Sequence, residues 1–182
     1  MIQLSTKLES PQIIGSHTNN PSDLVSDAGA ISIITPINAA IFMPVYISGN
    51  VTLTRAQWYN MVTVNGNMDV GLYTLDGTRL ASTGAVAQSG ADASQTAALT
   101  APIHVRRGVY YMAYSSSSGT STLNGVSYVG AVADMLALLG CARMAAAHPL
   151  PATATLVTII GAGYGGAGTT MPCILLTSRS FA

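Results

Sequence analysis

Three histidines, His17, His104 and His148, are the candidate general bases for a serine or cysteine nucleophile. Such a nucleophile needs a base within hydrogen-bond reach, and the base needs a third group to orient it. None of the three belongs to a recognised local signature around a serine or cysteine. His104 stands in the alternating run 103–105, and His148 precedes Pro149-Leu150-Pro151, which predicts an extended surface segment. We expect ordinary histidines and no catalytic residue, and a triad assembled from distant segments is the alternative left open.

Carboxylates are as sparse as bases. The closest pair, Asp23 and Asp27, lies in a polar N-terminal stretch, and Asp69 and Asp76 flank a predicted strand. Calcium sites in β proteins draw several oxygen ligands from one loop, and no Asp-rich loop is present. We expect no bound metal and no paired catalytic acids.

The two cysteines, Cys141 and Cys173, lie about thirty residues apart and do not have the spacing of metal ligands. Two buried thiols in a protein that folds in a reducing cytoplasm are the favoured interpretation, and a disulfide is the alternative.

The segment Gly161–Gly166 matches the pattern G-x-G-x-x-G that cradles dinucleotides. That loop works by opening a helix whose N-terminus holds a pyrophosphate, with an acidic residue about twenty positions later. Here Pro172 interrupts the segment that follows, and no Asp or Glu occurs after Asp134. The sequence therefore predicts a glycine-rich connection between strands, and no cofactor.

Composition points to a protein that works in contact with others. Charged residues make up 8% of the chain, where about 25% is typical, and the formal net charge is zero. Charges are depleted in the cores of protein–protein interfaces because their desolvation is costly. Only Arg106 and Arg107 are adjacent basic residues, so nucleic-acid binding is not expected. The charge-free stretch 152–176 is split by glycines and prolines, so no membrane span is expected, and residues 1–9 lack the apolar region of a signal peptide.

The remaining pattern is that of β-structure. Strands are expected over residues 31–33, 40–47, 51–58, 68–75, 79–83, 95–99, 109–114, 153–160 and 173–177. Pro44 should place its strand at an edge or bulge. Asn65-Gly66 and Asp76-Gly77 predict hairpin turns, at the spacing of an antiparallel sandwich. The serine run 115–121 predicts a solvated loop, and one short helix at most is expected around residues 130–141.

We divide the chain into an extended N-terminal arm, residues 1–29, and a single β-sandwich domain, residues 30–182. The arm is polar and turn-rich. A neighbouring subunit and the chain's own domain are equal candidates for the surface on which it lies.

Five aromatic residues concentrate in the central strands, and core packing is the commonest fate of such residues. A subunit interface or a glycan-binding platform are the two alternatives for this set, which comprises Trp58, Tyr59, Tyr110, Tyr111 and Tyr114.

The middle of the chain resembles a jelly-roll-like β-sandwich module of tailed-bacteriophage virion proteins. The resemblance covers roughly residues 38–126 and rests on segments 38–47, 51–55, 70–84 and 107–113, including Gly71-Leu72-Tyr73 and Gly108-Val109-Tyr110-Tyr111-Met112-Ala113. These segments are strands and turns, so no functional residue is carried over.

This resemblance implies a non-enzymatic structural protein located in the virion. The first expectation is a capsid decoration (cement) protein, trimeric, that binds the major capsid protein or other virion proteins and bridges capsid subunits. A tail- or fibre-associated carbohydrate-binding sandwich is the alternative.

Overall fold

The computed structural model describes residues 13–15, 31–34, 37–127, 140–158 and 170–178, and all its regular elements are strands. They are β1 (Ile13–Gly15), β2 (Ile31–Ile34), β3 (Ala40–Ile47), β4 (Val51–Asn60), β5 (Asn67–Tyr73), β6 (Arg79–Ser82), β7 (Val86–Ala87), β8 (Ala93–Val105), β9 (Gly108–Ser116), β10 (Thr122–Ser127), β11 (Ala142–Met144), β12 (Val157–Thr158), β13 (Thr170–Pro172) and β14 (Ile174–Thr177). The helix expected around residues 130–141 and the glycine-rich segment 161–166 lie almost wholly outside the described residues.

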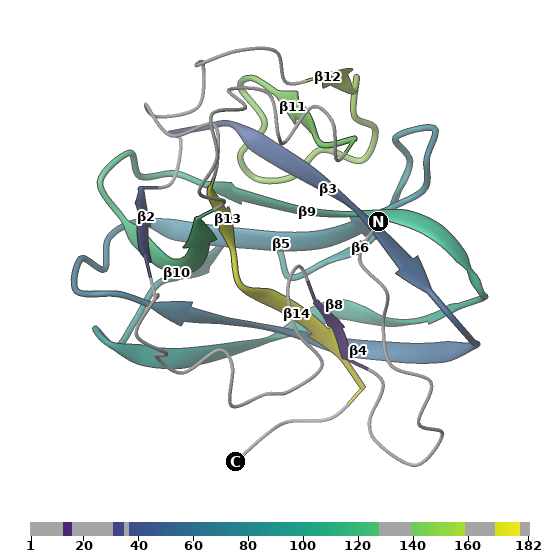
Figure 1. The fold of residues 1–182 in the computed structure, drawn as a ribbon, viewed down its shortest axis with the longest axis horizontal. Helices are drawn as coiled ribbons and strands as arrows, with labels where there is room; N and C mark the ends of the chain where they lie inside the picture. Colours follow the sequence, from purple (N-terminus) through teal and green to yellow (C-terminus); the bar gives the residue numbers. More distant parts are fainter. Residues whose placement is uncertain (1–12, 16–30, 35–36, 128–139, 159–169, 179–182) are drawn as a thin grey trace.

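The strands form two antiparallel sheets that pack face to face, which confirms the expected β-sandwich (Figure 1). Sheet A has the order β1-β14-β4-β10-β13, with β2 paired to β10 and β8 paired to β4. Sheet B has the order β12-β11-β3-β9-β5-β6, with β7 paired to β5. The core lies between β4, β8 and β14 on one side and β3, β9 and β5 on the other.

Alternation along β4 shows how the sequence forms this core. Val51 and Leu53 are buried and Thr52 between them is exposed. A register shift between Leu53 and Arg55 then returns Ala56 to the core side. Across this irregularity β4 advances two positions, from Leu53 to Arg55, while its partner β8 advances five, from Ile103 to Ala98.

Pro44 behaves as expected, because among the described strands β3 has a partner on both sides only at its start. Strand β11 pairs with residues 40–42, whereas β9 pairs with all of β3. At Pro44, where no N–H is available to a second neighbour, β3 is an edge strand.

Two turn predictions have different outcomes. Asp76-Gly77 does close a hairpin between β5 and β6, with Gly77 at φ +87°. The predicted Asn65-Gly66 hairpin is wrong, since β4 belongs to sheet A and β5 to sheet B. A type I′ turn needs positive φ at both central residues, and only Gly66 has it.

The prediction that the serine run 115–121 forms a solvated loop is also wrong. Ser115 and Ser116 end strand β9 and are fully buried, and Ser121 is fully buried as well. The hydroxyl of Ser116 donates to the carbonyl of Ser118 and accepts from its N–H, both at 3.1 Å. Local bonds of this type satisfy serine side chains without water, so composition alone misplaced the run.

Within the expected arm, β1 pairs with β14 at the edge of sheet A, so at Ile13–Gly15 the arm lies on its own domain. Cys141 and Cys173 are both buried and are not joined in a disulfide, as the favoured interpretation predicted. Among the described residues there is no helix with the length and apolar character needed to span a membrane.

Candidate functional site

His148 and Ser115 form the contact in this molecule that most resembles a catalytic pair. The Oγ atom of Ser115 lies 3.0 Å from Nδ1 of His148. Ser115 is the direct cross-strand partner of Asp69, which is fully buried on β5. The fold therefore brings a serine, a histidine and an aspartate together from three distant segments, and local sequence patterns gave no sign of it.

The segment that carries His148 is a strap, residues 147–154, that lies against the outer face of sheet B. Leu150 is almost completely buried in a cluster that includes Phe42 and Tyr73, whose rings meet edge to face with centroids 5.1 Å apart. The segment Pro149-Leu150-Pro151 was predicted to be at the surface, and Pro149 is exposed, but Leu150 is buried against sheet B. The strap supplies the second cover that lets β3 be buried on both faces.

Hydrogen bonds attach the strap along its length. The hydroxyl of Tyr73 donates to the carbonyl of Pro151 at 2.6 Å, and the guanidinium of Arg79 donates to the carbonyl of Leu150. At its two ends, the N–H of Ala147 donates to the carbonyl of Asn38 and the N–H of Ala154 to that of Gly77, both at 2.8 Å.

Asp69 hydrogen-bonds to the backbone of the strap and does not orient His148. Its Oδ2 accepts from the N–H of Leu150 at 2.9 Å, and its Oδ1 accepts from the hydroxyl of Thr83 at 3.2 Å. In a serine triad the carboxylate instead orients the imidazole through Nδ1, and the serine faces the substrate. Here Ser115 contacts Nδ1 itself and is 0% exposed. The cluster has the residue types of a triad in an arrangement that holds the strap.

Burial dominates the ionisation of both groups. It raises the pKa of Asp69 above its usual value and lowers the pKa of His148, which the Asp69 carboxylate partly opposes. Both shifts favour the uncharged form, as expected where desolvation outweighs the other effects.

Within the described residues, His104 does not assemble a site. His104 is exposed on β8, and its Nδ1 lies 3.1 Å from the hydroxyl of Thr52. His17 lies outside the described residues, as do Asp23 and Asp27. Asp76 is used by its own turn, where hydrogen bonds from Thr74 and Thr78 lower its pKa. Within the described residues no group of three or more His, Cys, Asp or Glu side chains could hold a metal.

The five aromatic residues do not share one face. Trp58 and Tyr114 are fully buried in the main core, and Tyr110 packs at its margin. Tyr59 is half-buried, and its hydroxyl donates to the carbonyl of Asp92 at 2.6 Å. Tyr111 lies on the strap side of sheet B, edge to face with Phe42. A single stacking platform made of all five is therefore absent.

Trp58 instead anchors a buried polar network that the sequence did not reveal. Its Nε1–H donates to Oδ1 of Asn60 at 3.0 Å, and the same oxygen accepts from Nε2 of Gln88 at 3.0 Å. The amide of Asn60 donates to the carbonyl of Ser89 at 2.8 Å and to Oε1 of Gln95 at 2.9 Å. All four polar positions of the Asn60 side chain are used, which is what makes such a network stabilising.

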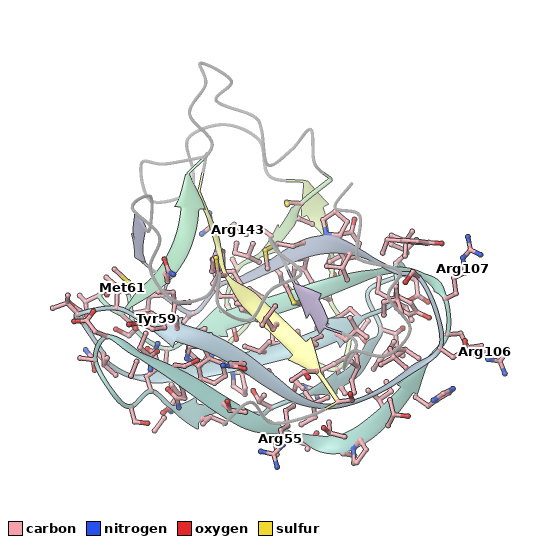
Figure 2. All side chains as sticks on the ribbon, turned by 60° about the horizontal axis from the view of Figure 1, so that its bottom comes forward. Arg55, Tyr59, Met61, Arg106, Arg107 and Arg143 are labelled. Carbon is pink, nitrogen blue, oxygen red and sulfur yellow. The ribbon has the colours of Figure 1, made fainter. Side chains whose placement is uncertain are left out.

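Exposed charge is confined to a few places on the described surface. Arg106 and Arg107 project from one end of the sandwich, whereas Tyr59 and Met61 lie at the opposite end (Figure 2). Arg55 projects separately from β4 (Figure 2). The exposed large apolar side chains in the described part are Ile37, Val62, Leu75 and Val109.

No protein-family model matches this chain, and no curated protein matches its sequence at a significant level.

Proposed function

We propose that this chain is a non-enzymatic structural subunit of a tailed-phage particle, and that it decorates the capsid by bridging capsid subunits. The observation that carries the proposal is the charge-poor composition, 8% charged residues and no net charge, on an antiparallel sandwich. A surface with few charges can be covered by neighbours without the desolvation cost that charges carry.

The chemistry of the described site supports the same class of protein. The contact between Ser115 and His148 is closed to a substrate, because Ser115 is fully buried beneath the strap that bears His148. Trp58 has no exposed ring surface on which a sugar could stack. Burial of both groups favours a structural role over hydrolysis and over glycan binding through this tryptophan.

Decoration would then act mechanically. Each subunit buries neutral surface against several capsid subunits, and a trimer would make such contacts simultaneously. Weak contacts that are linked in this way add to a strong attachment, because later contacts form at a high effective concentration. Closed symmetric oligomers are the usual form of such subunits.

The test is to purify particles, quantify this chain by mass spectrometry and repeat the measurement after deletion of residues 1–25. A copy number on the order of hundreds supports a head location, and one on the order of ten indicates the tail. The deletion removes β1 from the edge of sheet A and should abolish particle binding, while circular dichroism shows that the other strands remain folded. Absence of the chain from particles would contradict the proposed function. Unchanged occupancy of the deleted form would show that residues 1–25 are not needed for particle binding.

A further inference from the structure

Two connections between the sheets lie side by side at the end of the sandwich that carries Arg106 and Arg107. Residues 48–50 connect β3 to β4, and residues 106–107 connect β8 to β9. They are adjacent because Ile47 pairs with Gly108 in sheet B and Val51 pairs with Val105 in sheet A. We call the surface formed here by Tyr46, Arg106, Arg107, Val109 and Tyr110 the basic end.

The two arginines of the basic end are exposed and available to a partner. Neither forms an ion pair with a carboxylate of the described residues. The Nε–H of Arg107 donates to the hydroxyl of Tyr46 at 2.5 Å, and its guanidinium carbon lies 5.8 Å from the centroid of that ring. This contact holds the Arg107 side chain in place, so less conformational entropy is lost when it binds a further group.

Apolar and aromatic surface accompanies this charge. Val109 is 39% exposed, and Tyr110 is half-buried with its hydroxyl donating to the carbonyl of Arg106 at 3.0 Å. Arginine and tyrosine are enriched among the residues that contribute most to binding energy in protein interfaces. The other exposed arginine in the described part, Arg55, stands apart from this surface on β4 (Figure 2).

We propose that the basic end binds an acidic surface of another protein, with Arg106 and Arg107 paired to its carboxylates. This inference rests on the proposed function only in placing that acidic surface on a neighbouring particle protein. Carboxylates fit the arginine fork in a bidentate manner. Nucleic acid is the weaker candidate, since two arginines supply few of the phosphate contacts that such binding needs.

The first experiment measures the chain itself, with fluorescent poly-L-glutamate as the probe. Fluorescence anisotropy at low salt should show binding that a double variant, R106E/R107E, weakens by about tenfold or more. R55E makes the same charge change away from the basic end and should bind like the wild type. R107K keeps the charge but loses the contact with Tyr46, and should show an intermediate loss.

Three results would overturn the proposal. Equal loss in R55E and R106E/R107E would show general electrostatic attraction instead of a site. Tighter binding of a DNA duplex than of poly-L-glutamate would show that phosphate, not carboxylate, is the preferred group. Binding that persists unchanged at about 1 M NaCl would show that charge is not the cause, because the screening length there is only about 3 Å.

A second experiment separates this proposal from the proposed function. Particles that lack the chain are incubated with the wild type and with each variant, and the bound protein is quantified. Loss of particle binding in R106E/R107E alone supports both proposals. If R106E/R107E weakens poly-L-glutamate binding but no form binds particles, the proposal for the basic end is supported and the proposed particle function is contradicted. If all forms bind particles equally, the basic end does not dock there.

Discussion

The carboxylate of Asp69 accepts a hydrogen bond from the backbone N–H of Leu150, with 2.9 Å between Oδ2 and the nitrogen. This bond joins strand β5 to the strap, 81 residues further along the chain. Because the carboxyl is buried, its ionisation is coupled to how firmly the strap is held. The pH dependence of stability therefore includes a contribution from this contact.

We predict that Asp69→Asn changes the acid side of the stability profile. The pKa of Asp69 in the folded state is raised above 3.8, so the folded state binds more protons than the unfolded one in that interval. The free energy of unfolding should thus fall as pH rises from about 4 through the folded-state pKa, and the variant should lack this fall. Urea unfolding at a series of pH values measures it, and superimposable profiles would contradict the coupling.

His148 should make the free energy of unfolding fall as the pH is lowered, which is opposite to the effect of Asp69, and His148→Gln should remove this fall. Burial lowers the pKa of His148 below 6.5, so the unfolded state takes up a proton first as pH falls. The wild type should lose stability as pH drops below about 6.5, and the variant should lose less over the same range. His104→Gln is the matched control, because it changes an exposed histidine away from the strap. A similar effect in both variants would argue against the strap as the cause.

Gly77→Ala and Gly84→Ala should differ although both glycines have positive φ. An added Cβ at Gly77 would overlap the carbonyl oxygen of Ala154 in the strap, whereas at Gly84 the nearest atom is 3.7 Å away, in Thr100. We expect a cost of about 1 kcal/mol at Gly84 from backbone strain and at least twice that, about 2–3 kcal/mol, at Gly77. Denaturant titration measures both, and equal costs would show that the strap moves freely.

Asn60→Ala should be among the most damaging single substitutions. It leaves the buried donors of Trp58 and Gln88 without an acceptor, and removal of such partners costs about 3 kcal/mol in total. The control is Asn65→Ala, which removes an exposed side chain whose Nδ2 donates to the hydroxyl of Thr120 at 3.4 Å. This substitution should change the free energy of unfolding by less than about 0.5 kcal/mol. Thermal unfolding measures both variants, and an equal loss of stability in Asn60→Ala and Asn65→Ala would contradict the prediction.

Cys141 should be unreactive in the folded protein. Burial raises its pKa to about 12, so almost no thiolate is present at pH 8. Iodoacetamide labelling followed by peptide mass spectrometry should show modification of Cys141 only after denaturation. Rapid labelling under native conditions would indicate that this part of sheet B opens.

Local patterns predicted several strands, but they missed β10 and β11 and gave only residues 95–99 of β8. The apolar run 40–47 corresponds to β3, and the aromatic and β-branched run 109–114 lies within β9. The Asp76-Gly77 turn was predictable because both of its strands are neighbours in sequence and in the sheet. Each of these predictions depends only on residues close together in the chain.

Partner choice was not predictable in this way. Asn65-Gly66 has the composition of a hairpin turn, yet the strands on either side enter different sheets. The cluster of Asp69, Ser115 and His148 and the network around Asn60 depend on contacts between distant segments. A single sequence carries no local signal for such contacts, since the same residues are also common on surfaces and in turns.

The position of β14 has a consequence for synthesis. It pairs with β4 in sheet A, and the hydroxyl of Thr54 reaches the carbonyl of Thr177, 123 residues later. At translation rates of roughly 5–20 residues per second, β4 waits on the order of ten seconds for this neighbour. During that time one edge of β4 is open to pairing with another nascent chain. Yield of soluble protein should therefore depend on chaperones and on growth temperature.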